Sequence, residues 1–325
     1  MLTVSHISAD KGEKKKGTLQ VTDGQGNSVE IPVVLVNGTK EGPALCVTAG
    51  VHGAEYPGIE AALRLSQAIV PDQLKGSLIV LPIVNTAAFF SRSIYVNPHD
   101  SKNLNRVFPG KSNGSMCEII AYTLMEKVAP KVTHFVDLHG GDMIEALHPF
   151  ILMKRTKKNE VNSVTEKMAL HFGIETIMEI TEESTGWTGQ GTFFASMADR
   201  MIPSLICEAG GCGQLDEPST SLLYTGTMNI MKVLGMLTGS FEQSKTSEIF
   251  HHFVWINSKH QGIFYAKSRV GEYVKPKQLL GEIRDYSGTV LQSVSSPVEG
   301  RILFLVTSPA MKEGGVLMGI GAKEV

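Results

Sequence analysis

Short apolar runs and amphipathic segments alternate along the chain from about residue 44 to residue 237. Runs of small and β-branched residues predict buried strands at 44–49, 78–84, 133–138, 150–153, 175–180 and 204–207. Apolar residues at helical spacing predict helices at 57–69, 115–128, 159–172, 191–200 and 218–237. Such alternation is typical of a mixed, mostly parallel α/β sheet with helices on both faces.

The two ends of the chain follow a different pattern. Residues 18–21 and 29–36 alternate as β segments around a turn, which predicts a hairpin before the α/β region. After about residue 240 the helical pattern stops, and glycines recur between short β runs. We therefore predict a catalytic domain at 1–245 that includes the hairpin, and a small all-β domain at 246–325.

Composition narrows the classes of partner. The 325 residues are 42% hydrophobic and carry a net charge of −2, which gives no electrostatic reason to expect nucleic acid or an anionic membrane. No apolar run approaches the roughly 20 residues that cross a bilayer, and no secretory signal is visible at the N-terminus. The 4 cysteines form no Cys-x-x-Cys pair. These features are those expected of a cytoplasmic protein with a small-molecule partner.

Candidate metal ligands lie at the ends of two predicted strands. His52 and Glu55 are three residues apart in a glycine-containing turn after the strand at 44–49, and this spacing places both on one side. His139 ends the strand at 133–138 and supplies the third ligand of a His-His-Glu zinc site, with a fourth position left for water. Asp137 faces the same side of its strand as His139, where it either orients that imidazole or serves as a structural carboxylate.

A proton carrier is expected at a third strand end. Glu208 directly follows the strand at 204–207 and precedes two glycines. A glutamate beside activated water can take its proton and pass it to a leaving amine. Because ligands collect outside the carboxyl ends of parallel strands, we expect Glu208 to lie near the predicted metal ligands.

The long irregular segment at 85–113 holds the candidate substrate contacts. Arg106 offers a planar fork suited to a carboxylate, and Asn105 adds a neutral donor beside it. Arg92 is placed either to stabilise the oxyanion of a tetrahedral intermediate or simply at the surface. His99 is expected to be exposed.

The motifs together resemble those of the aspartoacylase and succinylglutamate desuccinylase family, within the zinc carboxypeptidase clan. They occur in the order His52-x-x-Glu55, Asn105-Arg106, His139-Gly-Gly and Glu208-Ala-Gly-Gly. The resemblance implies one Zn²⁺ per chain and hydrolysis of the amide of an N-acylated amino acid or related amine.

Residue by residue, the resemblance implies that His52, Glu55 and His139 bind the zinc. It also implies that Asn105 and Arg106 hold the substrate carboxylate and that Glu208 acts as general base and acid. An additional arginine is expected near the scissile carbonyl, and Arg92 is the candidate. The segment 181–190, with Trp187, would line the acyl side of the pocket.

Residues 271–283 and 296–302 resemble the two halves of a biotinyl or lipoyl carrier barrel. The turn between the halves, Arg284 to Gly288, contains no lysine for a swinging arm. We therefore expect a structural or pocket-shielding domain.

Two other functions remain open at this point. A metallocarboxypeptidase or small-peptide hydrolase would use the same catalytic residues, and a carrier or sensor could be built on an inactive hydrolase. The sequence also leaves the acyl group and assembly into a homo-oligomer undetermined.

Overall fold

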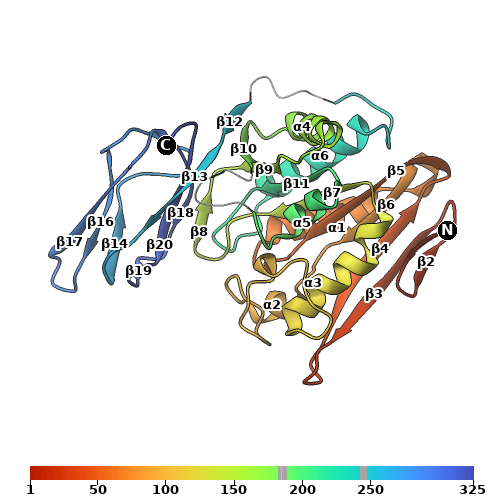
Figure 1. Ribbon diagram of the computed structural model, residues 1–325, viewed down its shortest axis with the longest axis horizontal. Coiled ribbons are helices and arrows are strands. Elements are labelled where there is room, and N and C mark those ends of the chain that lie inside the picture. The colour runs from red at the N-terminus through yellow and green to blue at the C-terminus, as the bar shows by residue number, and fades with distance from the viewer. Residues whose placement is uncertain (182–183, 185–188, 242–246) are drawn as a thin grey trace.

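The computed structural model describes residues 1–181, 184, 189–241 and 247–325. The molecule is elongated, with the C-terminal strands at one end and the N-terminus at the other (Figure 1). The described strands of the large sheet are β3 (Lys14–Thr22), β4 (Ser28–Asn37), β5 (Lys40–Ala49), β6 (Lys75–Leu81), β7 (His134–His139), β9 (Phe150–Lys154), β10 (Thr176–Ile180), β11 (Ser204–Glu208) and β12 (Glu248–Phe250).

The described helices are α1 (Tyr56–Ala68), α2 (Thr86–Ser91), α3 (Met116–Lys127), α4 (Asn159–Phe172), α5 (Phe193–Asp199) and α6 (Glu217–Val233). Short 3₁₀ turns are η1 (Pro71–Gln73), η2 (Leu104–Arg106) and η3 (Ala129–Lys131), and β1 (Leu2–Val4) pairs with β2 (Ile7–Ala9). No described helix combines the length and apolar character needed to cross a membrane.

The order of the large sheet is β12-β10-β9-β11-β7-β5-β6-β4-β3. Neighbours are parallel except at β9/β11, β4/β6 and β3/β4, which confirms the predicted mixed, mostly parallel sheet. The strands β11, β7 and β5 are adjacent and parallel, with Glu208 beside His139 and Leu138 beside Ala49. Their carboxyl ends therefore open onto the same edge of the sheet.

Helices cover both faces of this sheet, as predicted. On one face α1, α4 and α6 bury apolar side chains such as Leu65, Phe172 and Ile230 against the strands. On the other face α3 and α5 do so with residues such as Leu124 and Phe193. Each fully buried side chain of this size contributes about 1.5–3 kcal/mol of hydrophobic stabilisation.

Side-chain hydrogen bonds cap the N-terminal ends of α3 and α2. A capping box opens α3, where the Glu118 carboxylate accepts hydrogen bonds from the backbone N–H and the hydroxyl of Ser115. The helix α2 was not predicted within the irregular segment at 85–113. Asn85 caps it by accepting a hydrogen bond from the N–H of Ala88 at 3.2 Å.

The C-terminal part is built of two antiparallel sheets that enclose their own apolar core. One sheet has the order β13-β20-β18-β15 and the other β17-β16-β14-β19. Their bounds are β13 (His252–Asn257), β14 (Gly262–Ala266), β15 (Tyr273–Val274), β16 (Leu279–Arg284), β17 (Val290–Ser295), β18 (Gly300–Val306), β19 (Ala310–Met311) and β20 (Val316–Ala322).

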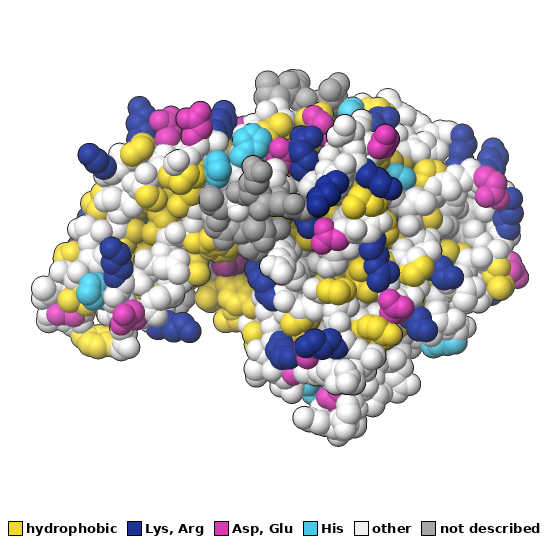
Figure 2. Space-filling model, in the orientation of Figure 1, with side chains coloured by type: hydrophobic (Ala, Val, Ile, Leu, Met, Phe, Trp, Pro, Cys, Tyr) yellow, Lys and Arg dark blue, Asp and Glu magenta, His cyan; other side chains and the backbone are white. Residues whose placement is uncertain are grey.

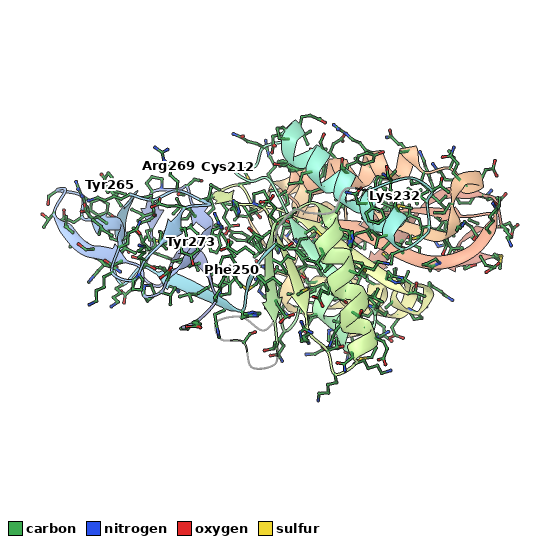
Figure 3. The ribbon with its side chains drawn as sticks, turned by 90° about the horizontal axis from the view of Figure 1, so that it is seen from above. Cys212, Lys232, Phe250, Tyr265, Arg269 and Tyr273 are labelled. Carbon is green, nitrogen blue, oxygen red and sulfur yellow. The ribbon has the colours of Figure 1, made fainter. Side chains whose placement is uncertain are left out.

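Two short strands cross between the domains. The strand β12, which the predicted boundary assigns to the C-terminal domain, pairs with β10 in the large sheet. Conversely β8 (Glu145–Leu147), inserted between β7 and β9, pairs with β18 of the C-terminal domain. Phe250 at the end of β12 is fully buried where the two parts meet (Figure 3). These two strand pairings join the C-terminal domain to the large sheet. The pairing of β8 does so close to the strand end that carries His139, because β8 follows β7 in the chain.

Candidate active site

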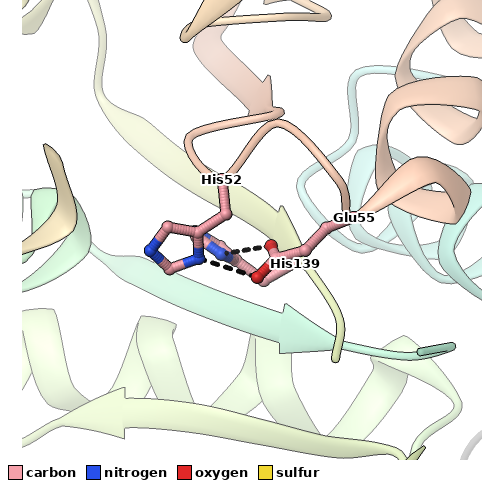
Figure 4. A group of neighbouring side chains, drawn as sticks. All are labelled: His52, Glu55 and His139. Carbon is pink, nitrogen blue, oxygen red and sulfur yellow. Dashed lines mark hydrogen bonds and ion pairs between the residues drawn. The ribbon is translucent and has the colours of Figure 1, made fainter. Parts of the chain in front are cut away.

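Three side chains from two strand ends converge at one point (Figure 4). The Nδ1 atom of His52 lies 2.7 Å from Glu55 Oε1, and Nδ1 of His139 lies 2.8 Å from Glu55 Oε2. One potential ligand atom from each residue falls within 4.8 Å of the others, and all three side chains are buried. The structure thus brings together the three residues that the sequence proposed as metal ligands.

The turn that carries His52 and Glu55 needs two of its glycines. Gly50 follows β5 with a φ of 62°, a conformation that glycine adopts without strain. Gly53 packs against the backbone of α2, where an added Cβ would lie 2.2 Å from the nitrogen of Phe89. The close packing of α2 against Gly53 therefore fixes the turn that follows β5.

A hydrogen bond on its far side orients His52. The Nε2 atom lies 3.1 Å from Oδ1 of Asn103, which also accepts the backbone N–H of Asn105 at 2.9 Å. Because a carboxamide oxygen only accepts, Nε2 must carry the ring proton. Nδ1 is then left with a free lone pair that faces Glu55, which is the tautomer a metal ligand requires.

His139 is supported by a carboxylate. Its Nε2 lies 3.1 Å from Oδ2 of Asp137, which is itself fully buried. The other oxygen of Asp137 accepts a hydrogen bond of 2.6 Å from the hydroxyl of Thr48 on β5. Asp137 lies on the same side of β7 as His139, as its spacing predicted, and its negative charge favours a proton on Nε2 with Nδ1 directed at Glu55.

The charge balance of this group suits a divalent cation. Burial acts to raise the pKa of Glu55, and only positive charge beside it, from protonated His52 and His139 or from a cation in place of their protons, acts to lower that pKa. Although Glu55 Oε2 lies close to His139, no described residue offers it a well-aligned hydrogen bond. Glu55 thus directs one carboxylate oxygen at each imidazole nitrogen, and two nitrogens with a carboxylate form a donor set that zinc prefers.

Glu208 lies next to His139 at the end of the neighbouring strand. Its carboxyl group lines the same pocket as His52 and Glu55. Burial raises the pKa of Glu208 well above its ordinary value; Glu55 and further carboxylates reinforce this shift and His139 opposes it. A cation held nearby would lower the pKa of Glu208. The position is the one expected for a proton carrier.

The predicted carboxylate-binding residues lie on η2, on the opposite wall. Arg106 lines the pocket, and its guanidinium donates a hydrogen bond of 2.7 Å to the carbonyl of Asn105. Burial lowers the pKa of Arg106, while Glu208 and other carboxylates act to raise it. Asn105 is buried, and its side-chain oxygen accepts the N–H of Phe193 at 2.9 Å. Arg106 therefore faces the cavity, whereas Asn105 ties η2 to α5.

Arg92 and His99 lie elsewhere. Arg92 ends α2 with an exposed side chain and is not among the residues that line the pocket shared by His52, Glu55, Arg106 and Glu208, here called the metal pocket after its candidate ligands. His99 is exposed, as expected. In the same segment, Tyr95 and Asn103 do line the pocket, and sequence reasoning gave neither a role. The Asn103-Leu104-Asn105 repeat offered a weak signal for Asn103, but none marked Tyr95.

The metal pocket has a volume of about 130 Å³, and polar, aromatic and aliphatic side chains line it. The C-terminal domain contributes Phe253, Trp255 and Phe304 to its wall, and β8 contributes Glu145 and Leu147. The surface is hollowed where the two domains meet, and hydrophobic side chains gather there (Figure 2).

The predicted acyl-side segment at 181–190 is described only in part. Trp187 belongs to residues 182–183 and 185–188, which lie outside the described residues.

Comparisons with known proteins agree with this geometry. The model of the succinylglutamate desuccinylase/aspartoacylase catalytic domain matches residues 41–234. The N-alpha-acetyl-L-2,4-diaminobutyric acid deacetylase of Halomonas elongata is 28% identical over 284 residues, which are 84% of this chain and 78% of that protein.

Solved structures share the fold over nearly the whole chain. The product-bound ectoine utilization protein EutE (DoeB) from Ruegeria pomeroyi superposes with a TM-score of 0.88 at 22% identity, covering 99% of both chains. A succinylglutamate desuccinylase/aspartoacylase from Rhodobacter sphaeroides gives a TM-score of 0.87 at 23% identity, again covering 99% of both chains. The fold of the whole chain is therefore that of the solved structures.

Proposed function

The chain belongs to the succinylglutamate desuccinylase/aspartoacylase family. From this premise we propose that it is a zinc-dependent hydrolase that removes the acyl group from an N-acylated amino acid or a related N-acylated amine. The observation that carries the proposal is the convergence of His52, Glu55 and His139 beside a pocket that Glu208 and Arg106 line. The deacetylase from Halomonas elongata supports a deacylation reaction.

The three converging side chains would hold one zinc ion. When bound, zinc polarises the scissile carbonyl and makes a water molecule more acidic. His52 would present a nitrogen lone pair because Asn103 accepts the proton of its other ring nitrogen, and the charge of Asp137 beside Nε2 of His139 favours the same tautomer there. Glu55 contributes the negative charge.

Glu208 would carry the proton through the reaction. Its carboxylate takes a proton from the attacking water as the water oxygen bonds to the carbonyl carbon. The same carboxyl group then returns that proton to the amide nitrogen as the C–N bond breaks. The products are a carboxylic acid and a free amine, and Glu208 ends as it began.

Arg106 would fix the substrate by its carboxylate. Its guanidinium lines the pocket and can form paired hydrogen bonds to a planar anion. Asn105 supports this arrangement by holding η2 against α5 through the N–H of Phe193. Substrate orientation of this kind lowers the entropic part of the barrier.

A panel assay tests the proposal. Zinc-loaded protein is offered acetylated, succinylated and longer-acylated amino acids, beginning with N-alpha-acetyl-L-2,4-diaminobutyrate, beside dipeptides that a carboxypeptidase would cleave. We expect release of amine from an N-acyl amino acid, loss of that activity in chelator and recovery on adding zinc. Turnover that continues unchanged in chelator would refute zinc dependence, and turnover of dipeptides alone would refute deacylation.

Glu208→Gln separates proton transfer from metal binding. The change keeps the size of the side chain but removes its ability to accept a proton. We expect kcat to fall by about 10²–10⁴-fold, the usual contribution of a general base, while zinc content stays at the wild-type level. Near-normal kcat in this variant would show that another group carries the proton.

A further inference from the structure

Tyr95 occupies a position in the metal pocket that the proposed mechanism has not used. Its ring lies edge-to-face against the His52 imidazole, with centroids 6.2 Å apart and planes at 83°. It lines the metal pocket of about 130 Å³ and also the larger groove of about 640 Å³ between the domains. Tyr95 therefore stands where a substrate would pass from the groove to the metal ligands.

The backbone of Tyr95 is held in an unfavourable conformation. Its φ of 60° is unusual for a residue with a side chain and costs of order 1 kcal/mol or more. Its N–H donates a hydrogen bond of 2.9 Å to the carboxylate of Asp142, which is fully buried. The adjoining Val96 forms a β-bridge with Asn103, the residue that orients His52. The strain is thus opposed by contacts that aim the phenol ring into the pocket.

Few side chains around the pocket can donate a hydrogen bond to a substrate carbonyl. The candidates among its described lining residues are His52, Tyr95, Asn103, Arg106 and Trp255. The ring proton of His52 is bonded to Asn103, and Arg106 is assigned to the substrate carboxylate. Arg92, the predicted carbonyl partner, has an exposed side chain outside the pocket lining. Of the other three, Asn103 is held by its hydrogen bonds with His52 and Asn105, and Trp255 packs against Phe253 and Phe304 on the C-terminal wall. Tyr95 is the one whose ring packs against the candidate ligand His52.

We propose that the Tyr95 hydroxyl, rather than an arginine, hydrogen-bonds the oxygen of the scissile carbonyl as negative charge develops on it. The proposal rests on the proposed deacylase function. In the free protein the hydroxyl interacts with the carboxylate of Glu145 on β8. Rotation about the C–O bond redirects the same proton to the substrate, so Tyr95 donates a hydrogen bond and transfers no proton.

This assignment makes Tyr95 a catalytic residue with a defined thermodynamic signature. A donor placed for the tetrahedral oxyanion strengthens its interaction as the carbonyl becomes tetrahedral, so it binds a tetrahedral anion better than a planar one. A residue that only packs against His52 would affect both kinds of anion equally. The two roles can therefore be separated by binding measurements that need no turnover.

The experiment titrates zinc-loaded protein with methylphosphonate, a tetrahedral anion, and with acetate, a planar one. Three variants are compared by calorimetry. Tyr95→Phe keeps the ring and removes the hydroxyl, and Arg92→Gln tests the competing assignment. Tyr122→Phe, the control, removes the hydroxyl of an exposed tyrosine on α3. We expect Tyr95→Phe to weaken methylphosphonate binding about 10-fold and acetate binding by less than about 3-fold, so that the preference for the tetrahedral anion falls by at least about 3-fold. Tyr122→Phe should match wild type.

The opposite outcomes are equally defined. Equal weakening of both anions in Tyr95→Phe, or none, would overturn the proposal, and so would a loss of methylphosphonate affinity in Arg92→Gln instead. Wild-type protein that takes up no zinc would contradict the proposed function itself, which is a different result. With a substrate in hand, Tyr95→Phe should also lower kcat by about 10- to 100-fold with little change in KM.

Discussion

Two regions of different construction face each other across the metal pocket. The first, here called the strand-end centre, comprises His52, Glu55, His139 and Glu208, which follow or end adjacent parallel strands. The second, the loop wall, is the segment 94–106 that carries Tyr95, Asn103 and Arg106. Backbone hydrogen bonds of the sheet position the first region, whereas the second depends mainly on hydrogen bonds of individual side chains.

The contrast is visible in how each region is anchored. In the strand-end centre, β11, β7 and β5 align in register, and Glu55 and His139 are 3% and 1% exposed. In the loop wall, Asn97 is buried and donates its amide to Asn85 at 2.9 Å, and Asn103 braces both His52 and Asn105. Single substitutions should therefore abolish chemistry when they remove a strand-end ligand, and tune it when they alter the loop wall.

The largest expected effect comes from removing a strand-end ligand. His139→Ala should lose stoichiometric zinc and more than about 10³-fold in activity, because two ligands bind zinc far more weakly than three. His99→Ala, an exposed histidine of the loop wall, serves as the matched control and should keep both properties. Metal content by mass spectrometry and rate are measured on the same samples, with circular dichroism to verify folding. Full zinc occupancy in His139→Ala would mean that the metal is held elsewhere.

The same contrast explains what could be predicted from the sequence. His139 and Glu208 end apolar runs whose parallel pairing places them side by side, so their proximity follows from the strand pattern alone. Tyr95 has no such signal, because its place depends on a φ of 60° and on a hydrogen bond to Asp142, 47 residues away. The charge of Arg92 makes it a candidate for the carbonyl oxygen, yet it ends α2 at the surface.

Fold elements divide in a similar way. The helix α4 spans 159–172 as predicted, because its apolar spacing is regular over several turns. The strands β8 and β12 have three residues each, too few for a periodic pattern. Both depend on partners far along the chain, β18 for one and β10 for the other. Their pairing decides where the two domains join.

A smaller effect is expected from the residue behind a ligand. Asp137→Asn keeps the shape of the side chain but removes the charge that favours a proton on Nε2 of His139. The wrong tautomer then places the proton on Nδ1, and we expect zinc affinity to fall by about 10- to 100-fold. Thr48→Val removes only the hydroxyl that bonds Asp137, so its effect should be the smaller of the two. Competition with a chelating dye measures both, and unchanged affinity in Asp137→Asn would exclude an orienting role.

The smallest expected effect is on stability, and it comes from the ion pair between Lys102 of the loop wall and Glu118 of α3. Glu118 accepts a hydrogen bond of 2.8 Å from Lys102, next to Asn103, as well as those of the capping box. Lys102 and the backbone of Ser115 hold the pKa of Glu118 at about 2, below its ordinary value of 4.5. Since the folded state favours the ionised form, this contribution is present above pH 4.5 and is lost as pH falls through 2.

Glu118→Gln should therefore lower the free energy of unfolding by about 1 kcal/mol at pH 7, and by less at pH 3. Glu313→Gln, at an exposed position in the C-terminal domain, is the control and should change stability little at either pH. Urea unfolding at the two pH values gives the difference directly. If Glu118→Gln costs as much at pH 3 as at pH 7, the capping geometry rather than the charge accounts for the stabilisation, and the loop wall is not anchored by an ion pair.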